Sequence, residues 1–308
     1  MIDLSKSSID FLKGKYFAFI TSIILILLSI GLFFLNGLNF GIDFKGGTLI
    51  EIETQNKIEI SEVRSSLNSL SLGDIQVQEF GSEKNLLIRI EQQQGGDQIQ
   101  QNVLEIVKQK LMNDISETIN FRRTEVVGPK VSGELIQSGT IAILVAVFAM
   151  LIYIWLRFEW QFSLGAVIAL LHDVILTIGV FCLTQLEFNL PIIAAILTIV
   201  GYSMNDTVVV YDRVRENLRK FRSKEITSLL NLSINETLSR TIVTSVTTLL
   251  ALVSLYIFGG EVIKGFTFAM IWGVLVGTYS SIFVAAPLLT YLDVKREWNT
   301  TTAVDSTK

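Results

Sequence analysis

The fold of this chain is decided by the stretch FNLPIIAAILTIVGYSMNDTVVVY, residues 188–211. An α-helix rises 1.5 Å per residue, so roughly twenty apolar residues span the ~30 Å hydrocarbon core of a bilayer. The stretch is long enough to do this, and its one charged residue is Asp206. It therefore predicts a transmembrane helix that carries a carboxyl group inside the membrane.

Five further apolar runs of similar length lie elsewhere in the chain. They cover residues 16–35, 139–156, 162–183, 241–258 and 265–292. Half of the 308 residues are hydrophobic, 18% are charged against about 25% in ordinary soluble proteins, and the mean hydropathy is +0.52. The sequence thus excludes a wholly soluble protein and predicts a polytopic α-helical membrane protein with six transmembrane helices.

The charge and the cysteine and histidine content exclude several functions. The net charge of -4 comes from 29 acidic and 25 basic residues, so no basic excess is available to bind nucleic acid. Cys182 is the single cysteine and His172 the single histidine, which leaves neither an internal disulfide nor a ligand set for a metal. We expect no metal site and no cofactor.

Basic residues mark one side of the membrane, because short loops rich in lysine and arginine stay in the cytoplasm. Such loops are the N-terminal segment 1–15, the turn at 157–161 and the loop 212–240. The connections 184–187 and 259–264 together contain one basic residue, Lys264. Both termini are therefore predicted to be cytoplasmic, including the tail 293–308. Residues 36–138 then form a domain outside the membrane, and residues 139–292 form helices two to six.

Two segments near the cytoplasmic side need interpretation. The first apolar run is longer than the ~7–15 residues of a signal peptide and no small-residue cleavage site follows it, so we expect a retained anchor. Within the loop 212–240, apolar residues recur at helical spacing from Ile226 to Leu238. This pattern is typical of a helix on the membrane surface and equally of a linker helix packed on the bundle.

The domain between the first two helices shows alternating strand and helix signals. The residues predict strands at 47–54, 75–80, 86–91 and 118–127, with a turn at 81–85 and helices near 60–70 and 99–112. Ser61 is a possible N-cap of the first of these helices. The order βαββαβ predicts a ferredoxin-like α+β domain with both helices on one face of the sheet.

Glycine and proline mark the two ends of this domain. Gly46 and Gly47 fit a tight junction between the first helix and the domain better than an anion-binding turn, because the lysine and serine of a phosphate loop are missing. Gly128 and Pro129 end the last strand and open the second helix, since proline is tolerated in a first helical turn.

Polar residues inside the predicted membrane helices are the candidate functional residues. An aspartate at a helix centre costs about 2.5–3.5 kcal/mol, so Asp206 must face protein or water. Tyr202 and Ser203 lie one turn earlier on its face, and Asn205 is adjacent. Arg240 begins the predicted fifth helix on the same side. The pair Asp206–Arg240 is a hypothetical proton relay; a static ion pair and an arginine that snorkels to the surface are the alternatives.

A second ionisable pair, His172 and Asp173, lies near the middle of the predicted third helix. Such a pair indicates either transport or the packing of helices through hydrogen bonds, and packing is the favoured interpretation. Gly273 and Gly277 form a small-residue face suited to close helix contact.

Four motifs together resemble the SecD/SecF family of bacterial protein-export membrane subunits, on its SecF side. They are FGIDFKGGTLIEI (40–52), VVGPKVSGEL (126–135), LLHDVILTIG (170–179) and GYSMNDTVVVYDRVREN (201–217). The first contains Gly41, Asp43, Gly46 and Gly47, and the last contains Asp206. The resemblance covers nearly the whole chain up to Trp298.

The resemblance implies a non-enzymatic subunit in the bacterial inner membrane, related to resistance-nodulation-division transporters. By this likeness SecD, on a separate chain, supplies the other half, and the complex uses a proton or sodium gradient to draw a translocating polypeptide out of the SecYEG channel. Asp206 and Arg240 match the family's acid and arginine for ion flow. The alternatives are a stand-alone small-molecule exporter and an intramembrane aspartyl protease built on Asp173 and Asp206, which lacks the Gly-x-Gly-Asp motif.

Overall fold

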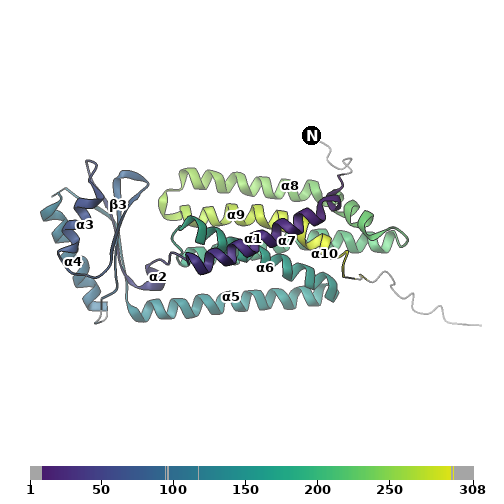
Figure 1. Cartoon of the computed structure of the whole chain (residues 1–308), viewed down its shortest axis with the longest axis horizontal. Helices are drawn as coiled ribbons and strands as arrows, with labels where there is room; N and C mark the ends of the chain where they lie inside the picture. Colours follow the sequence, from purple (N-terminus) through teal and green to yellow (C-terminus); the bar gives the residue numbers. More distant parts are fainter. Residues whose placement is uncertain (1–8, 94, 96, 117, 293, 295–308) are drawn as a thin grey trace, which may run out of the picture.

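The computed structural model describes residues 9–93, 95, 97–116, 118–292 and 294. The molecule is elongated, with a bundle of long helices at one end and a small α/β domain at the other (Figure 1). The first eight residues and, apart from residue 294, the predicted cytoplasmic tail lie outside the described residues.

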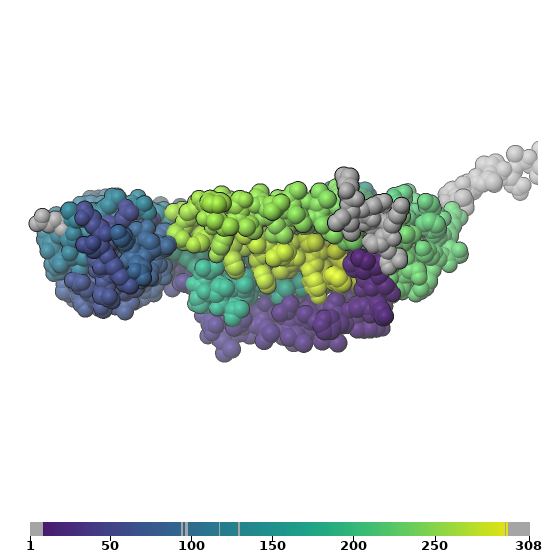
Figure 2. Space-filling view, turned by 90° about the horizontal axis from the view of Figure 1, so that it is seen from above, coloured from purple at the N-terminus to yellow at the C-terminus, as the bar shows by residue number. Residues whose placement is uncertain are grey.

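Within the described residues, six helices are long and apolar enough to cross a membrane, so the polytopic fold is confirmed. They are α1 (Lys15–Leu35), α5 (Pro129–Arg157), α6 (Trp160–Thr184), α7 (Leu190–Lys220), α8 (Ile226–Phe258) and α9 (Lys264–Ser280). The last helix continues through a π-helical segment, Ser281–Ala285, into the short α10 (Ala286–Leu288). Figure 2 shows α1 and α8 on opposite sides of the bundle with α9 between them.

The helices extend beyond the apolar runs that predict them, and they also occupy most of the predicted connection 212–240. It consists mainly of the end of α7 and the start of α8, which are joined by residues 221–225. The amphipathic segment that begins at Ile226 is the first part of α8 and does not lie separately on the membrane surface. Its apolar face, including Leu229, Leu230 and Ile234, is buried in the bundle core, because that face continues in phase along the same helix.

The α/β domain contains a sheet of β1 (Gly47–Glu53), β2 (Ile75–Phe80), β3 (Ser82–Ile90) and β4 (Asn120–Val127). In the described part of the chain the strand order is β2-β3-β1-β4, and each neighbouring pair is antiparallel. The helices α3 (Ile60–Asn68) and α4 (Asp97–Asp114) cover the face of the sheet that points away from the bundle (Figure 1). Their apolar sides and the sheet form one core around Ile50, Val63 and Val107.

Two local expectations in this domain are wrong. The predicted turn at 81–85 is shorter, because β3 begins at Ser82 and only Gly81, with a φ of +80°, separates it from β2. Ser61 does not cap α3, because the helix begins at Ile60 and Glu59 occupies the N-cap position.

The central strand β1 is buried on both faces, although its alternating sequence is typical of a half-buried strand. Ile50 and Ile52 face the α3–α4 core. Leu49 packs with Leu87 and with Ile42, which belongs to the single-turn helix α2 (Ile42–Lys45). The second face is covered because the domain sits against the end of the membrane bundle.

The junction between α1 and the domain depends on two glycines. Gly46 and Gly47 have φ angles of +72° and +114°, which residues with a Cβ rarely adopt. A Cβ on Gly47 would also lie 2.3 Å from the carbonyl oxygen of Ile90 on β3. The chain therefore turns tightly from α2 into the centre of the sheet.

We predict that Gly47→Ala destabilises the domain by about 2 kcal/mol, because the backbone is strained and the strands must separate. Gly133→Ala is the matched control: a Cβ at Gly133 meets nothing within 4 Å in α5, and alanine favours a helix over glycine by about 1 kcal/mol. Thermal unfolding of the detergent-solubilised protein measures both. Equal melting temperatures for the two variants would contradict the prediction.

Candidate functional site

The carboxyl group of Asp206 lies inside the bundle on α7, with 7% of the residue exposed. Its Oδ1 accepts a hydrogen bond of 2.7 Å from the hydroxyl of Thr241 on α8. Its Oδ2 has no hydrogen-bond partner among the described residues. A buried carboxyl oxygen without a donor is costly, so this atom is the unsatisfied position of the site.

Arg240 does not pair with Asp206 in this conformation. It lies well inside α8, not at the start of a helix, and its side chain is exposed. No ion pair within 4 Å joins it to Asp206 in the described part of the chain. The residue that contacts the carboxyl is its neighbour Thr241, so the arginine stands beside the site without neutralising it.

The polar residues before Asp206 divide between two faces of α7. Ser203 is buried and donates a hydrogen bond to Asp173 Oδ2 on α6. Tyr202 is half-buried, and its hydroxyl has no partner within the described residues. Asn205 is exposed. A step of one residue turns an α-helix by about 100°, so Asn205 points away from the face that Ser203 and Asp206 share.

Asp173 is a second buried carboxyl, 1% exposed, and it connects three helices. Besides Ser203 of α7, Ser280 of α9 donates to its Oδ2 at 2.8 Å. His172 Nδ1 lies 2.9 Å from its Oδ1, and the imidazole stacks on Tyr279 of α9 with 6.0 Å between ring centres. The arrangement holds α6, α7 and α9 together, as the packing interpretation expects.

Of the hydroxyl groups around these two carboxyls, the sequence singled out Ser203 and missed those of Thr241, Ser280 and Ser281. Thr241, Ser280 and Ser281 lie in apolar helices where serine and threonine are frequent, and most of those hydroxyls bond to their own backbone. Ser281 bonds to Thr207 at 2.9 Å and lies beside the Asp206 carboxyl. Which of the many serine and threonine residues lie opposite an aspartate on a neighbouring helix is the signal that would have identified them.

The glycine-rich motif connects the α/β domain to the bundle. Asp43 Oδ2 accepts a hydrogen bond of 2.8 Å from the backbone N–H of Leu190, the first residue of α7. The backbone N–H of Gly41 donates to the carbonyl of Phe188 at 2.8 Å. A Cβ on Gly41 would lie 2.5 Å from Glu187 Oε1, so a larger residue here would push the Glu187 side chain out of its position. Asp43 thus caps the helix that carries Asp206.

An ion pair reinforces this connection from the sheet. Arg89 on β3 contacts Glu187, in the loop between α6 and α7, with 2.9 Å between Nη2 and Oε2. The two side chains are 11% and 22% exposed, so the pair is partly shielded from water. Arg89 also reaches the carbonyl of Phe40 at 3.5 Å.

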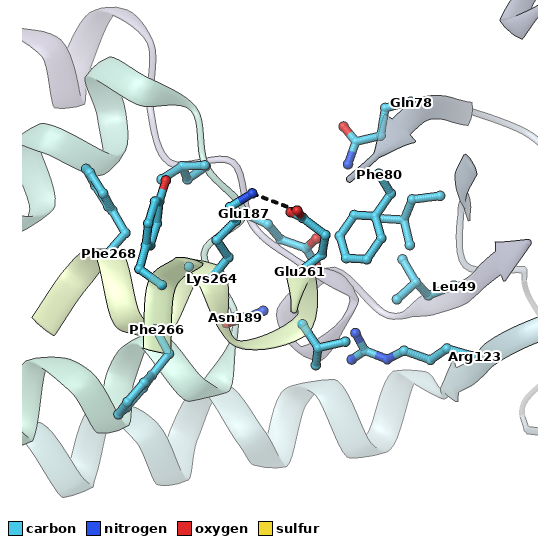
Figure 3. A pocket seen from close by; sticks show the side chains of 15 residues that line it. Leu49, Gln78, Phe80, Arg123, Glu187, Asn189, Glu261, Lys264, Phe266 and Phe268 are labelled. Carbon is cyan, nitrogen blue, oxygen red and sulfur yellow. Dashed lines mark hydrogen bonds and ion pairs between the residues drawn. The ribbon is translucent and has the colours of Figure 1, made fainter. Parts of the chain in front are cut away.

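A cleft of about 210 Å³ lies between the domain and the bundle. Leu49, Phe80 and Arg123 line it from the sheet, and Phe266 and Phe268 line it from α9 (Figure 3). At its edge Lys264 Nζ and Glu261 Oε1 are 2.6 Å apart. The side chain of Glu261 packs on Gly81, so the connection between α8 and α9 touches the turn between β2 and β3.

The remaining motif opens the second membrane helix. Gly128 occupies the N-cap position of α5 in an extended conformation, and Pro129 is the first residue of the helix. In the ranges that the structure describes, no group of three or more histidine, cysteine or acidic residues is arranged to hold a metal ion.

Two family descriptions match the chain. Residues 107–295 match "Protein export membrane protein SecD/SecF, C-terminal", and residues 31–58 match the "SecD/SecF GG Motif". The second match covers the junction formed by Gly41, Asp43, Gly46 and Gly47.

Curated relatives match along almost the full chain. "Protein translocase subunit SecF" of Rickettsia bellii is 48% identical over 292 residues, which are 95% of this chain and 96% of that protein. The protein of the same name from Rickettsia rickettsii is 46% identical and covers 96% of this chain and 95% of its own. That of Rhodobacter capsulatus is 45% identical, with 94% and 91% covered.

A solved structure of SecDF, a translocon-associated membrane protein from Thermus, has a TM-score of 0.84 and 33% identity to this chain. The match covers 94% of this chain and 39% of that one, so this chain spans about two fifths of SecDF. A second structure, of SecDF in a super-membrane-facing form, has a TM-score of 0.68 at 34% identity, with 92% and 38% covered. These matches confirm the resemblance read from the four motifs, and the chain belongs to the SecD/SecF family of protein export membrane proteins.

Proposed function

We propose that this chain is the SecF subunit of a SecD/SecF complex that uses the proton or sodium gradient to promote late steps of protein translocation through SecYEG. The observation that carries the proposal is the buried carboxyl of Asp206, with Oδ1 held by Thr241 and Oδ2 without a donor among the described residues. A charge that crosses 100 mV supplies about 2.3 kcal/mol. That is a factor of ~50 in an equilibrium between two conformations.

The contact between α7 and α8 is the element that the ion changes. Uptake of one proton on Oδ2 neutralises Asp206 and leaves its hydrogen bond from Thr241 as a weaker, uncharged one. Arg240 makes no ion pair with Asp206 in the described structure, so neutralisation breaks no salt bridge here. The two helices then move relative to each other because the bond that joins them has lost its charge.

The helix α7 transmits this movement to the α/β domain. Sixteen helical steps of 1.5 Å separate Asp206 from Leu190, a distance of about 24 Å. At that end Asp43 caps the helix, and Arg89 holds the preceding loop through Glu187. A shift of α7 therefore displaces the domain directly, and the displaced domain grips or releases the emerging polypeptide.

The orientation follows from the distribution of basic residues. Arg157, the basic end of α7 and the start of α8 lie at the end of the bundle that is remote from the domain (Figure 1). With lysine and arginine kept in the cytoplasm, both termini are cytoplasmic and the domain is periplasmic. Its element order and its sheet order β2-β3-β1-β4 support a ferredoxin-like domain in that position.

The partner is SecD on a separate chain, which supplies the other half of the transporter. The exposed side chains of Asn205 and Arg240 support this, because polar groups at membrane depth need protein or water around them. The coverage of about two fifths of the SecDF structure supports it as well.

We predict that Asp206→Asn removes most of the potential-dependent acceleration of export, up to the factor of about 50 that one charge supplies at 100 mV. Asparagine keeps the size and the acceptor for Thr241 but binds no proton. The assay is the export rate in vesicles that contain this chain, SecD and SecYEG, with and without an imposed gradient.

Asp212→Asn on the same helix is the matched control. Asp212 pairs with Arg157 at 2.6 Å, and both side chains are about two fifths exposed, so its loss changes stability by no more than about 1 kcal/mol. We expect export by this variant to depend on the gradient as in the wild type. Gradient-driven export that is undiminished in Asp206→Asn, at normal abundance of the complex, refutes the proposed function.

We predict that Arg89→Glu and Glu187→Arg each weaken the coupling of export to the gradient, because each brings like charges together at the domain junction. The double reversal restores the attraction, with an interaction energy of about 1–3 kcal/mol in the cycle. Export assays and spin-label distances between the domain and the bundle measure the effect. If the double variant is no better than the single ones, the ion pair does not form the connection.

A further inference from the structure

A second titratable site in the bundle is not used by the function proposed above. Asp173 and His172 on α6 are 1% and 2% exposed, so both lie away from lipid and from water. The carboxyl accepts hydrogen bonds from Ser203 on α7 and from Ser280 on α9. Its charge state therefore sets how firmly α6 is attached to two other helices.

This pair is connected to Asp206 through adjacent residues on two helices. On α7, Ser203 and Asp206 are three residues apart and share one face. On α9, Ser280 contacts Asp173, while the next residue, Ser281, bonds to Thr207 and lies beside Asp206. The donors of Asp173 therefore lie one turn from Asp206 on α7 and next to Ser281 on α9.

The connection lies where α9 departs from regular geometry. The segment Ser281–Ala285 is π-helical, a form that occurs mostly as single turns at functional sites. The Ser280 hydroxyl lies within 3.1 Å of the Gly277 carbonyl as well, so it has a second acceptor ready. A Cβ on Gly277 would lie 2.9 Å from that of Ser203, so α7 and α9 touch at this level.

The imidazole of His172 provides an open position for a proton. An ionised Asp173 can only accept, so Nδ1 donates to it, and Nε2 is buried with no partner in the residues that the structure describes. A neutral imidazole in this tautomer has a bare lone pair on Nε2, which can bind one proton.

In the part of the chain that the structure describes, His172 and Asp173 pair with each other and form an ion pair with no third group. The titratable group that faces it from α9 is Tyr279, whose hydroxyl bonds to Ser22 of α1. The titratable group of α7 nearest to the pair along the helix is Asp206, one turn from Ser203, which donates to Asp173. Among the described residues, the buried polar groups of α1 are Ser22 and Ser29, neither of which titrates at ordinary pH.

We propose that the His172–Asp173 pair is a second proton-binding site of the coupling machinery, linked to Asp206 through Ser203 and the Ser280–Ser281 step of α9. This inference rests on the function proposed above. One proton binds to Nε2, and the Nδ1 proton passes to Asp173 Oδ1, 2.9 Å away, which gives a neutral acid beside a neutral imidazole. No other covalent bond forms or breaks, and the later release of the proton from Nε2 reverses both steps.

Protonation of the pair releases α9 from α6. A neutral carboxyl on Asp173 is a weaker acceptor, so the Ser280 hydroxyl turns to the Gly277 carbonyl. The π-helical segment that follows then shifts beside Asp206. Asp173 thus acts as a positioning residue for Asp206 and as a proton acceptor in its own right.

The test compares Asp173→Asn, Asp173→Glu and the wild type in vesicles that contain SecD and SecYEG under an imposed pH gradient. We expect Asp173→Asn to lower gradient-driven export about tenfold and to change its pH profile, because one titrating group has been removed. Asp173→Glu retains a carboxyl and keeps the wild-type pH dependence. An unchanged pH profile in Asp173→Asn, with the gradient-dependent acceleration lost in Asp206→Asn, overturns the inference and leaves the proposed function standing.

A second measurement does not depend on export. Infrared difference spectra of the purified complex, recorded on a pH change, report the carbonyl band of protonated carboxyl groups. We expect Asp173→Asn and Asp206→Asn each to alter this band, and Ser280→Ala to shift it without removing it. Ser254→Ala, whose hydroxyl bonds to its own helix at Leu250, is the control and leaves it unchanged. A spectrum of Asp173→Asn identical to that of the wild type overturns the inference.

Discussion

The structure depends on the placement of carboxyl groups inside an apolar bundle. An aspartate at membrane depth costs about 2.5–3.5 kcal/mol, and the chain meets this cost with hydroxyl groups from neighbouring helices, not with arginine. Thr241 reaches Asp206, and Ser203 and Ser280 reach Asp173. Each carboxyl therefore joins helices through uncharged donors. Such contacts hold the bundle together and still permit a change of protonation, since no cation is left unpaired when the charge is lost.

The second constraint is the continuity of α7. The helix runs from the cap at Asp43 to the basic residues beyond the membrane, and it carries both Ser203 and Asp206. A helix is stiff over this length, so its two ends move together. The close approach at Gly41 and the ion pair at Arg89 attach the domain to the same end of α7. The glycine at position 41 fits this arrangement, because a Cβ there would displace the Glu187 side chain that pairs with Arg89.

Apolar runs were sufficient to predict the membrane helices, and strand and helix periodicity predicted the element order of the domain. The helix ends were not predictable in the same way, because hydropathy marks the depth of lipid and an α-helix continues into water. The residues from Ile226 illustrate this, since they belong to α8 and not to a separate surface helix. The acids stood out in the sequence because charge is rare there. Ser203 stood out with them, but the donors Thr241 and Ser280 did not, because serine and threonine are common in apolar helices and most bond to their own backbone.

Asn205 and Arg240, which the sequence grouped with Asp206, lie on a different face of the bundle from it. Asn205 and Arg240 lie next to Asp206 and Thr241 in sequence, yet both side chains are exposed, whereas the two residues beside them are buried. An amide and a guanidinium at this depth are unfavourable against lipid tails and favourable against protein or enclosed water. The described part of the chain offers neither of them a hydrogen-bond partner. A protein partner that covered this face would place Arg240 in a shielded setting, where its charge would act strongly on Asp206.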